Sequence, residues 1–82
     1  MMKHITISHE KHEQGWRVWV NGQKASAVKV QNALLLALHK AGIIPTHFSR
    51  LGRQNACKAT AEVLQDYEGP GVTWAITVLS KQ

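Results

Sequence analysis

"WRVWVNGQKASA", residues Trp16 to Ala27, is the stretch that decides the fold. An Asn-Gly pair between two alternating segments is the strongest short signal of a β-hairpin, because both turn positions need a positive φ. A two-residue turn at Asn21 and Gly22 also fixes the strand register and places Trp19 opposite Lys24. The stretch therefore predicts a hairpin with one apolar and one polar face.

The two faces of this hairpin have different expected roles. Alternation assigns to the core Trp16, Val18, Val20, Ala25 and Ala27, and to the other face Arg17, Trp19, Lys24 and Ser26. An aromatic ring between two cations can stack on a nucleic-acid base or anchor a protein partner. Two structural roles for Trp19 stay open: a cross-strand cation–π pair, and burial in a homodimer formed through the open sheet face.

Periodicity predicts the remaining elements. Residues 4–8 and 72–80 alternate as half-buried strands do, and residues 9–15 have the polar composition of a connection. Residues 30–41 are predicted to form a helix with one apolar stripe. Leu35 and Leu36 lie off that stripe, so this helix should contact a second element besides the sheet. Asn55 can cap a second helix, which ends before Gly69.

The expected fold class is α+β. The elements follow the order β-β-β-α-α-β with a short third strand, which indicates a two-layer sandwich. Its sheet is mainly antiparallel, and two helices pack on one face. A chain of 82 residues supports one hydrophobic core, so residues 1–82 are expected to form a single domain.

Charge is unevenly distributed along the chain. The formal net charge is +5, but residues 1–61 carry nine Lys or Arg and two acids, whereas residues 62–82 carry one Lys and three acids. Clustered positive charge attracts phosphates and speeds encounter with a polyanion. Charge can also serve solubility alone, so both interpretations stay open.

Cysteine content and hydropathy narrow the class of protein. Cys57 is the only cysteine, which excludes an internal disulfide and a cysteine-based zinc site and suits a reducing compartment. The longest unbroken apolar run, residues 33–38, is far shorter than the roughly 20 residues of a membrane helix. Residues 1–14 lack the apolar segment of a signal peptide. We expect a cytoplasmic protein that does not engage membranes.

Residues suited to catalysis or metal binding are few. His9 and His12 lie beside Glu10 and Glu13, but a polar loop does not hold such a set at ligand geometry. No glycine-rich phosphate loop, nucleophile elbow or His–acid pair of mechanistic spacing occurs. Cys57, near the start of the second helix, is interpreted as a packing residue. The sequence predicts a protein that is not an enzyme and needs neither cofactor nor metal.

"AGIIPTHFSRL", residues 41–51, resembles the turn and the start of the recognition helix in helix-turn-helix DNA-binding regulators. The resemblance implies a turn at residues 41–43 and a helix that begins at Pro45, with Phe48 and Leu51 pointing inward. It also implies DNA contacts from Ser49, Arg50 and Arg53.

Two positions depart from that family's pattern. Leu38 stands where the family has a small residue, and Gly52 would interrupt the recognition helix at a cost of about 1 kcal/mol. We therefore favour a helix stop at Gly42 followed by a connector to the second helix. Arg50, Arg53 and Lys58 then form a basic group around that connector, suited to phosphate contact or to a solvated loop.

The leading hypothesis is a small basic binding module that engages nucleic acid or a nucleoprotein. The expected binding residues are Arg17, Trp19, Lys24, Arg50, Arg53 and Lys58. The first alternative is a phage-like accessory protein that inhibits or adapts a host protein complex, such as a defence nuclease or CRISPR complex, by protein–protein contact. The second alternative is a helix-turn-helix-like DNA-binding regulator.

Overall fold

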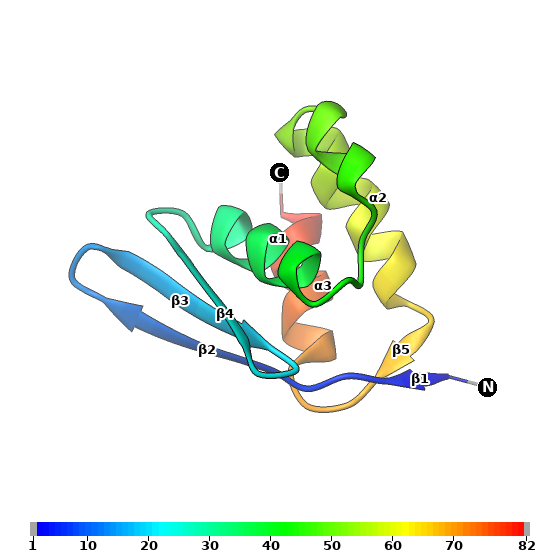
Figure 1. The fold of residues 1–82 in the computed structure, drawn as a ribbon, viewed down its shortest axis with the longest axis horizontal. Coiled ribbons are helices and arrows are strands. Elements are labelled where there is room, and N and C mark those ends of the chain that lie inside the picture. Colours follow the sequence, from blue (N-terminus) through cyan, green and yellow to red (C-terminus); the bar gives the residue numbers. More distant parts are fainter. Residues whose placement is uncertain (1, 82) are drawn as a thin grey trace.

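A three-stranded antiparallel sheet occupies the first third of the chain (Figure 1). The computed structural model describes residues 2–81. The strands are β2 (Ile7–His12), β3 (Gly15–Val20) and β4 (Gln23–Ala27), in that spatial order. The sequence predicts a loop after residue 8, and this boundary is wrong: β2 continues to residue 12 because it pairs with the whole of β3.

The hairpin turn has the predicted geometry. The φ angle is +50° at Asn21 and +84° at Gly22, as a two-residue turn with matching strand twist requires. The predicted β3–β4 register is confirmed, with Trp19 opposite Lys24. Asn21 also ties the turn to the start of β2, because its Oδ1 accepts the Thr6 N–H (3.0 Å) and its own N–H donates to the Thr6 carbonyl (2.9 Å).

Helix α1 (Val30–Lys40) covers the apolar face of the sheet and contacts β3 and β4. Its buried residues are Ala33, Leu34, Ala37 and Leu38. The buried side chains of the sheet are Ile7, Val18, Val20 and Ala25. Both sets agree with the predicted apolar stripes, and together they bury one face of each element.

A connector and a second helix follow α1. The connector contains one 3-10 helix, η1 (Thr46–Arg50), and helix α2 (Arg53–Leu64) begins after Gly52. The predicted connector is thus confirmed. The expected capping role of Asn55 is wrong, because α2 begins two residues earlier. Its Nδ2 instead donates to the carbonyl of Leu51 (3.1 Å).

A short parallel strand pair joins distant parts of the chain. Strand β1 (Lys3–His4) pairs with β5 (Tyr67–Glu68). The contact continues beyond both strands, where the N–H of Ile7 donates to the carbonyl of Pro70 (2.8 Å). The segment before β2 is therefore held by the segment that leads into the last helix.

Residues Val72–Ser80 form helix α3, so the strand predicted there is wrong. The buried residues repeat with a helical period and are Val72, Ala75, Val78 and Leu79. Thr73 and Thr77 lie on the exposed side, where the hydroxyl of Thr77 donates to the carbonyl of Thr73 (2.9 Å). Valine, threonine and tryptophan favour strands, but that preference depends on context, and packing against α2 decides this segment.

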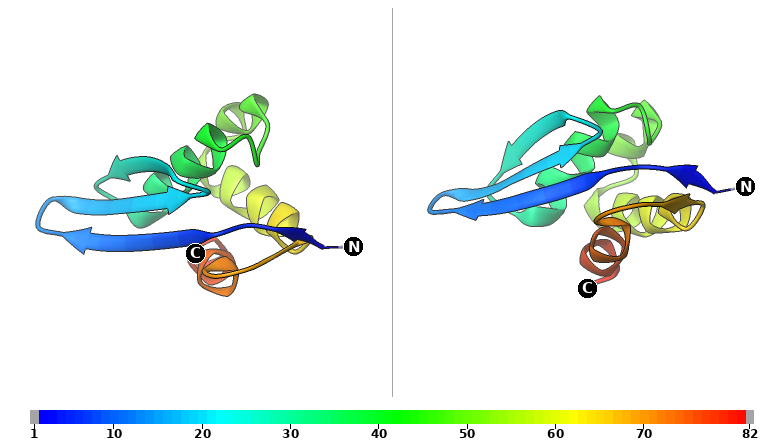
Figure 2. Two further views of the ribbon diagram at one scale, coloured as in Figure 1. Left: turned by 60° about the horizontal axis from the view of Figure 1, so that its bottom comes forward. Right: turned by 90° about the horizontal axis from the view of Figure 1, so that it is seen from below.

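The predicted α+β class is confirmed, with three α-helices instead of two packed against the antiparallel sheet. Helix α1 covers one face, α3 lies alongside β2, and α2 packs against α3 (Figure 2). Gln31 joins α1 to the end of α3, because its Nε2 donates to the carbonyls of Val78 and Lys81 (3.0 Å each). One cluster of buried side chains runs through the sheet and all three α-helices.

Candidate functional site

The sheet face that α1 leaves uncovered carries one tryptophan. Cross-strand pairing places Ser8, Trp19 and Lys24 in one row of this open face, and Glu10, Arg17 and Ser26 in the next. Figure 2 (right) looks onto the open face, with α1 behind the sheet. Trp19 is half-buried and lies outside the core cluster, because its neighbours Val18 and Val20 take the inward positions of β3.

An ion pair occupies the row beside Trp19. The Nη1 of Arg17 donates to the Oε1 of Glu10 at 2.9 Å, and both side chains are well exposed to solvent. An exposed pair of this kind contributes only about 0.2–1 kcal/mol to folding. Its main effect is electrostatic: Glu10 neutralises one of the two cations that the sequence places beside Trp19.

Lys24 supplies the second cation, and the fold adds a third. The Nζ of Lys40, at the end of α1, donates to the backbone carbonyl of Lys24 at 2.9 Å. The side chains of Lys24 and Lys40 thus place two ammonium groups near the turn of the hairpin. Sequence reasoning missed Lys40, because only the packing of α1 on β4 brings residues 24 and 40 together.

The tryptophans differ in their contacts with cations. Lys11 lies over the ring of Trp16 at 6.0 Å from the ring centroid, and Lys3 lies over Tyr67 at 5.8 Å. Within residues 2–81, no such cation–π contact involves Trp19. The cross-strand cation–π pair with Lys24, one of the two structural alternatives for Trp19, is therefore not formed, and the ring face of Trp19 is not engaged by a cation of residues 2–81.

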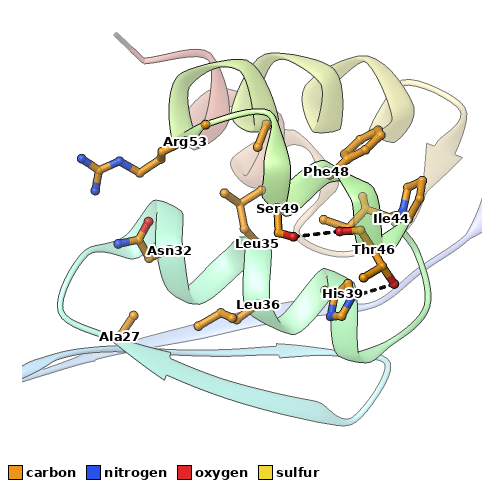
Figure 3. A pocket seen from close by; sticks show the side chains of 13 residues that line it. Ala27, Asn32, Leu35, Leu36, His39, Ile44, Thr46, Phe48, Ser49 and Arg53 are labelled. Carbon is orange, nitrogen blue, oxygen red and sulfur yellow. Dashed lines mark hydrogen bonds between the residues drawn. The ribbon is translucent and has the colours of Figure 1, made fainter.

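The second predicted basic group, which consists of Arg50, Arg53 and Lys58, does not lie on the open sheet face. Arg50 ends η1, while Arg53 and Lys58 belong to α2, and all three are exposed. Arg53 lines a groove on the side of the sheet that α1 covers (Figure 3). The strand register places Trp19 on the opposite face of the sheet. The structure thus does not bring the six predicted residues together, because Arg17, Trp19 and Lys24 belong to the open sheet face, Arg53 lines this groove, and Lys58 lines a separate hollow between α2 and the end of α3.

That groove, of about 560 Å³, runs between α1 and the η1–α2 segment (Figure 3). Its apolar lining comes from Ala27, Leu35, Leu36, Ile44, Phe48 and Ala56. Its polar rim includes Asn32, His39, Thr46, Ser49 and Arg53. The position of Leu35 and Leu36 off the main stripe of α1 was the one sequence signal that pointed to this surface.

His9 and Glu10, two of the four histidines and acids at residues 9–13, make other contacts in the structure. The ring of His9 stacks on Trp74, and Glu10 pairs with Arg17. Within the described residues, no group of three His, Cys, Asp or Glu side chains is placed to hold a metal ion.

Cys57 is 1% exposed, and burial raises the pKa of its thiol above the ordinary value of 9.0, with Arg53 opposing the shift. A buried, protonated thiol is a poor nucleophile, which fits the predicted packing role.

The helix-turn-helix geometry is not formed. Gly52, with φ of +80°, separates η1 from α2, so no continuous recognition helix begins at Pro45. Phe48 packs against the core as that resemblance implies, but Leu51 is 39% exposed and lies outside the core cluster. The recognition helix that the resemblance implies is therefore wrong, whereas the DNA-binding function of the second alternative stays a prediction.

Comparison with protein-family models, curated proteins and solved structures finds no match to this chain. Within residues 2–81, the structure contains no helix of the length and apolarity needed to span a membrane.

Proposed function

We propose that the protein binds single-stranded nucleic acid on the open face of β2, β3 and β4. The observation that carries the proposal is the position of Trp19, which lies outside the core, half-buried, with no cation among residues 2–81 over its ring. Aromatic rings on such surfaces stack on bases of any sequence and contribute about 1–3 kcal/mol per stacked base. A single strand offers unpaired bases to such a ring, whereas duplex bases are already stacked on one another.

Charge around the open face supports the same function. Lys24 lies opposite Trp19, and Lys40 adds its ammonium group at the carbonyl of Lys24. These cations can contact the phosphates on either side of a stacked base. Each phosphate neutralised lowers the logarithm of the binding constant by about 0.7 per tenfold increase in salt for a single strand. Arg17 contributes less, because Glu10 shares its charge.

The test is a fluorescence anisotropy titration of a labelled oligothymidylate of about 12 nucleotides, within the site sizes of small single-strand binding domains. Trp19→Ala should weaken binding by about 1–3 kcal/mol, and Trp19→Phe should keep most of the affinity. Lys24→Ala should reduce the salt slope by about 0.7, whereas Arg50→Ala, on the other surface, should leave it unchanged. Affinity that is insensitive to both salt and Trp19→Ala would refute the proposal.

A protein-contact function is the second candidate, and the apolar groove favours it. An inhibitor or adaptor of a host protein complex, including a defence nuclease or CRISPR complex, would use such a surface. The two candidates predict different sensitive residues: Trp19 and Lys24 for nucleic acid, and groove residues such as Leu36 for a protein partner.

A further inference from the structure

The groove between α1 and the η1–α2 segment presents apolar surface to solvent. Ile44 is buried at 7% exposure, Leu35 and Phe48 are half-buried, and Leu36 is 48% exposed (Figure 3). Val28 follows the lining residue Ala27 in the chain and is 77% exposed, but it is not itself a lining residue. Concave apolar surface of this kind marks interaction sites in soluble proteins.

Three polar side chains of the groove, His39, Thr46 and Ser49, already have hydrogen-bond partners within its wall. The Nε2 of His39 and the hydroxyl of Thr46 lie at hydrogen-bond distance (3.3 Å), and the hydroxyl of Ser49 donates to the Thr46 carbonyl (2.9 Å). These groups form part of the wall (Figure 3) and do not need an occupant to pair with them. Most of the favourable free energy of an occupant would therefore come from apolar contact.

Arg53 gives the groove its charge preference. None of the lining residues is acidic. Within residues 2–81, the guanidinium of Arg53 forms no ion pair. An arginine side chain pairs best with a carboxylate, which it can hold with two parallel hydrogen bonds. An occupant that combines apolar side chains with a carboxylate would therefore match both the lining and the rim.

The walls of the groove also restrict the backbone conformation of the occupant. Helical segments form both sides, so the backbone N–H and C=O groups there are used within the helices. The edge strand β4 contributes only its last residue, Ala27, to the lining, which is too short an edge for an extended peptide to add as a further strand. A helix satisfies its own backbone and offers an apolar face at i, i+3, i+4 and i+7.

We propose that this groove binds an amphipathic α-helix of a partner protein. The apolar face of that helix lies against Leu35, Leu36 and Phe48, and an acidic residue of the helix pairs with Arg53. The apolar lining comes from β4, α1 and the η1–α2 segment, and the repeated apolar face of a helix can contact all three, which is why we favour a helix over a small apolar carboxylate. The groove and the open sheet face share no residue, so the failure of either proposal leaves the other intact.

The test is a selection from a displayed library of random peptides of about 16 residues, the length at which an isolated helix begins to be populated. The enriched peptides should combine apolar residues at helical spacing with at least one Asp or Glu. Leu36→Glu should weaken the best peptide by about tenfold or more. Leu51→Glu is the matched control, because Leu51 is also exposed but lies outside the lining, and it should bind normally.

A charge exchange tests the role of Arg53. Arg53→Glu should weaken the acidic peptide by about tenfold, and replacing the acid of the peptide by lysine should restore binding to this variant. Arg50→Glu, three residues earlier in the chain and outside the lining, should show no such exchange.

Three results would overturn the proposal. The first is enrichment of peptides without the helical or acidic pattern, and the second is equal binding to wild type and Leu36→Glu. The third is a groove that binds dodecanoate, an apolar carboxylate, while the library yields no peptide. Circular dichroism melts of each variant establish that loss of binding is not loss of fold.

Discussion

The imidazole of His9 lies parallel to the indole of Trp74, with ring centroids 3.7 Å apart and ring planes 6° apart. His9 belongs to β2 and Trp74 to α3, so the stack fastens the sheet to the last helix. Trp16 of β3 adds a tilted contact with His9 at 6.0 Å between centroids. Two of the three tryptophans thus serve the fold, and Trp19 does not take part.

The His9–Trp74 stack should contribute measurably to stability. His9→Ala should lower the free energy of unfolding by about 1 kcal/mol, since aromatic pairs contribute about 0.5–1.5 kcal/mol beyond burial of area. His9→Phe keeps an aromatic ring and should recover most of the loss. Urea denaturation measures both, and equal stability of His9→Ala and wild type would contradict a stabilising stack.

Removing the negative charge of Glu10 should strengthen nucleic-acid binding. Glu10→Gln frees the guanidinium of Arg17 beside Trp19, and we expect affinity for the oligothymidylate to rise severalfold at low salt. The unfolding free energy should change by less than about 1 kcal/mol, because the ion pair is exposed. Glu62→Gln makes the same charge change on α2 and is the control. Equal gains from both variants would show that only total charge matters.

Gly71 should tolerate substitution less well than Gly22. Both have positive φ, +86° and +84°, so alanine at either position costs about 1–2 kcal/mol from backbone conformation. A Cβ at Gly71 would also collide with the backbone oxygen of Ile7, whereas a Cβ at Gly22 meets no heavy atom within 4 Å. Thermal denaturation should show a much lower melting temperature for Gly71→Ala than for Gly22→Ala. Similar melting temperatures for the two variants would contradict the close approach of the Ile7 backbone to Gly71.

The thiol of Cys57 should resist modification in the folded protein. Burial raises its pKa, so the folded state keeps the proton at a pH where the unfolded chain has lost it. The contribution of this thiol to the free energy of unfolding is complete below pH 9.0 and declines as the pH rises above that value. Cys57→Ala should therefore show a smaller loss of stability at alkaline pH than wild type. Reaction with a thiol reagent should follow unfolding, and fast reaction in native buffer would show that the side chain is accessible.

The hairpin and the first helix could be predicted from the sequence because their signals are local. Asn21 and Gly22 determine a turn, the turn determines the register, and the register places Trp19 on the face opposite Val18 and Val20. The stripe of α1 is equally local, and Leu35 off that stripe correctly indicated a second contact.

Helix α3 could not be predicted because its apolar residues fit two periods. Residues 72–80 alternate as a strand, yet positions 72, 75, 78 and 79 also share a helical face. The groove and the contact between Lys40 and Lys24 were hidden for a different reason. Both are formed by segments that are distant in sequence, and a local sequence pattern does not indicate which distant segments come into contact.

The most direct test of the central claim is the response of the three tryptophan indole N–H signals in an NMR titration with oligothymidylate. We predict that the Trp19 signal shifts and that the shift saturates with added oligothymidylate. The signals of Trp16 and Trp74, whose rings contact His9, should stay in place. Shifts confined to Trp16, Trp74 or the α2 backbone, with Trp19 unmoved, would contradict binding on the open sheet face.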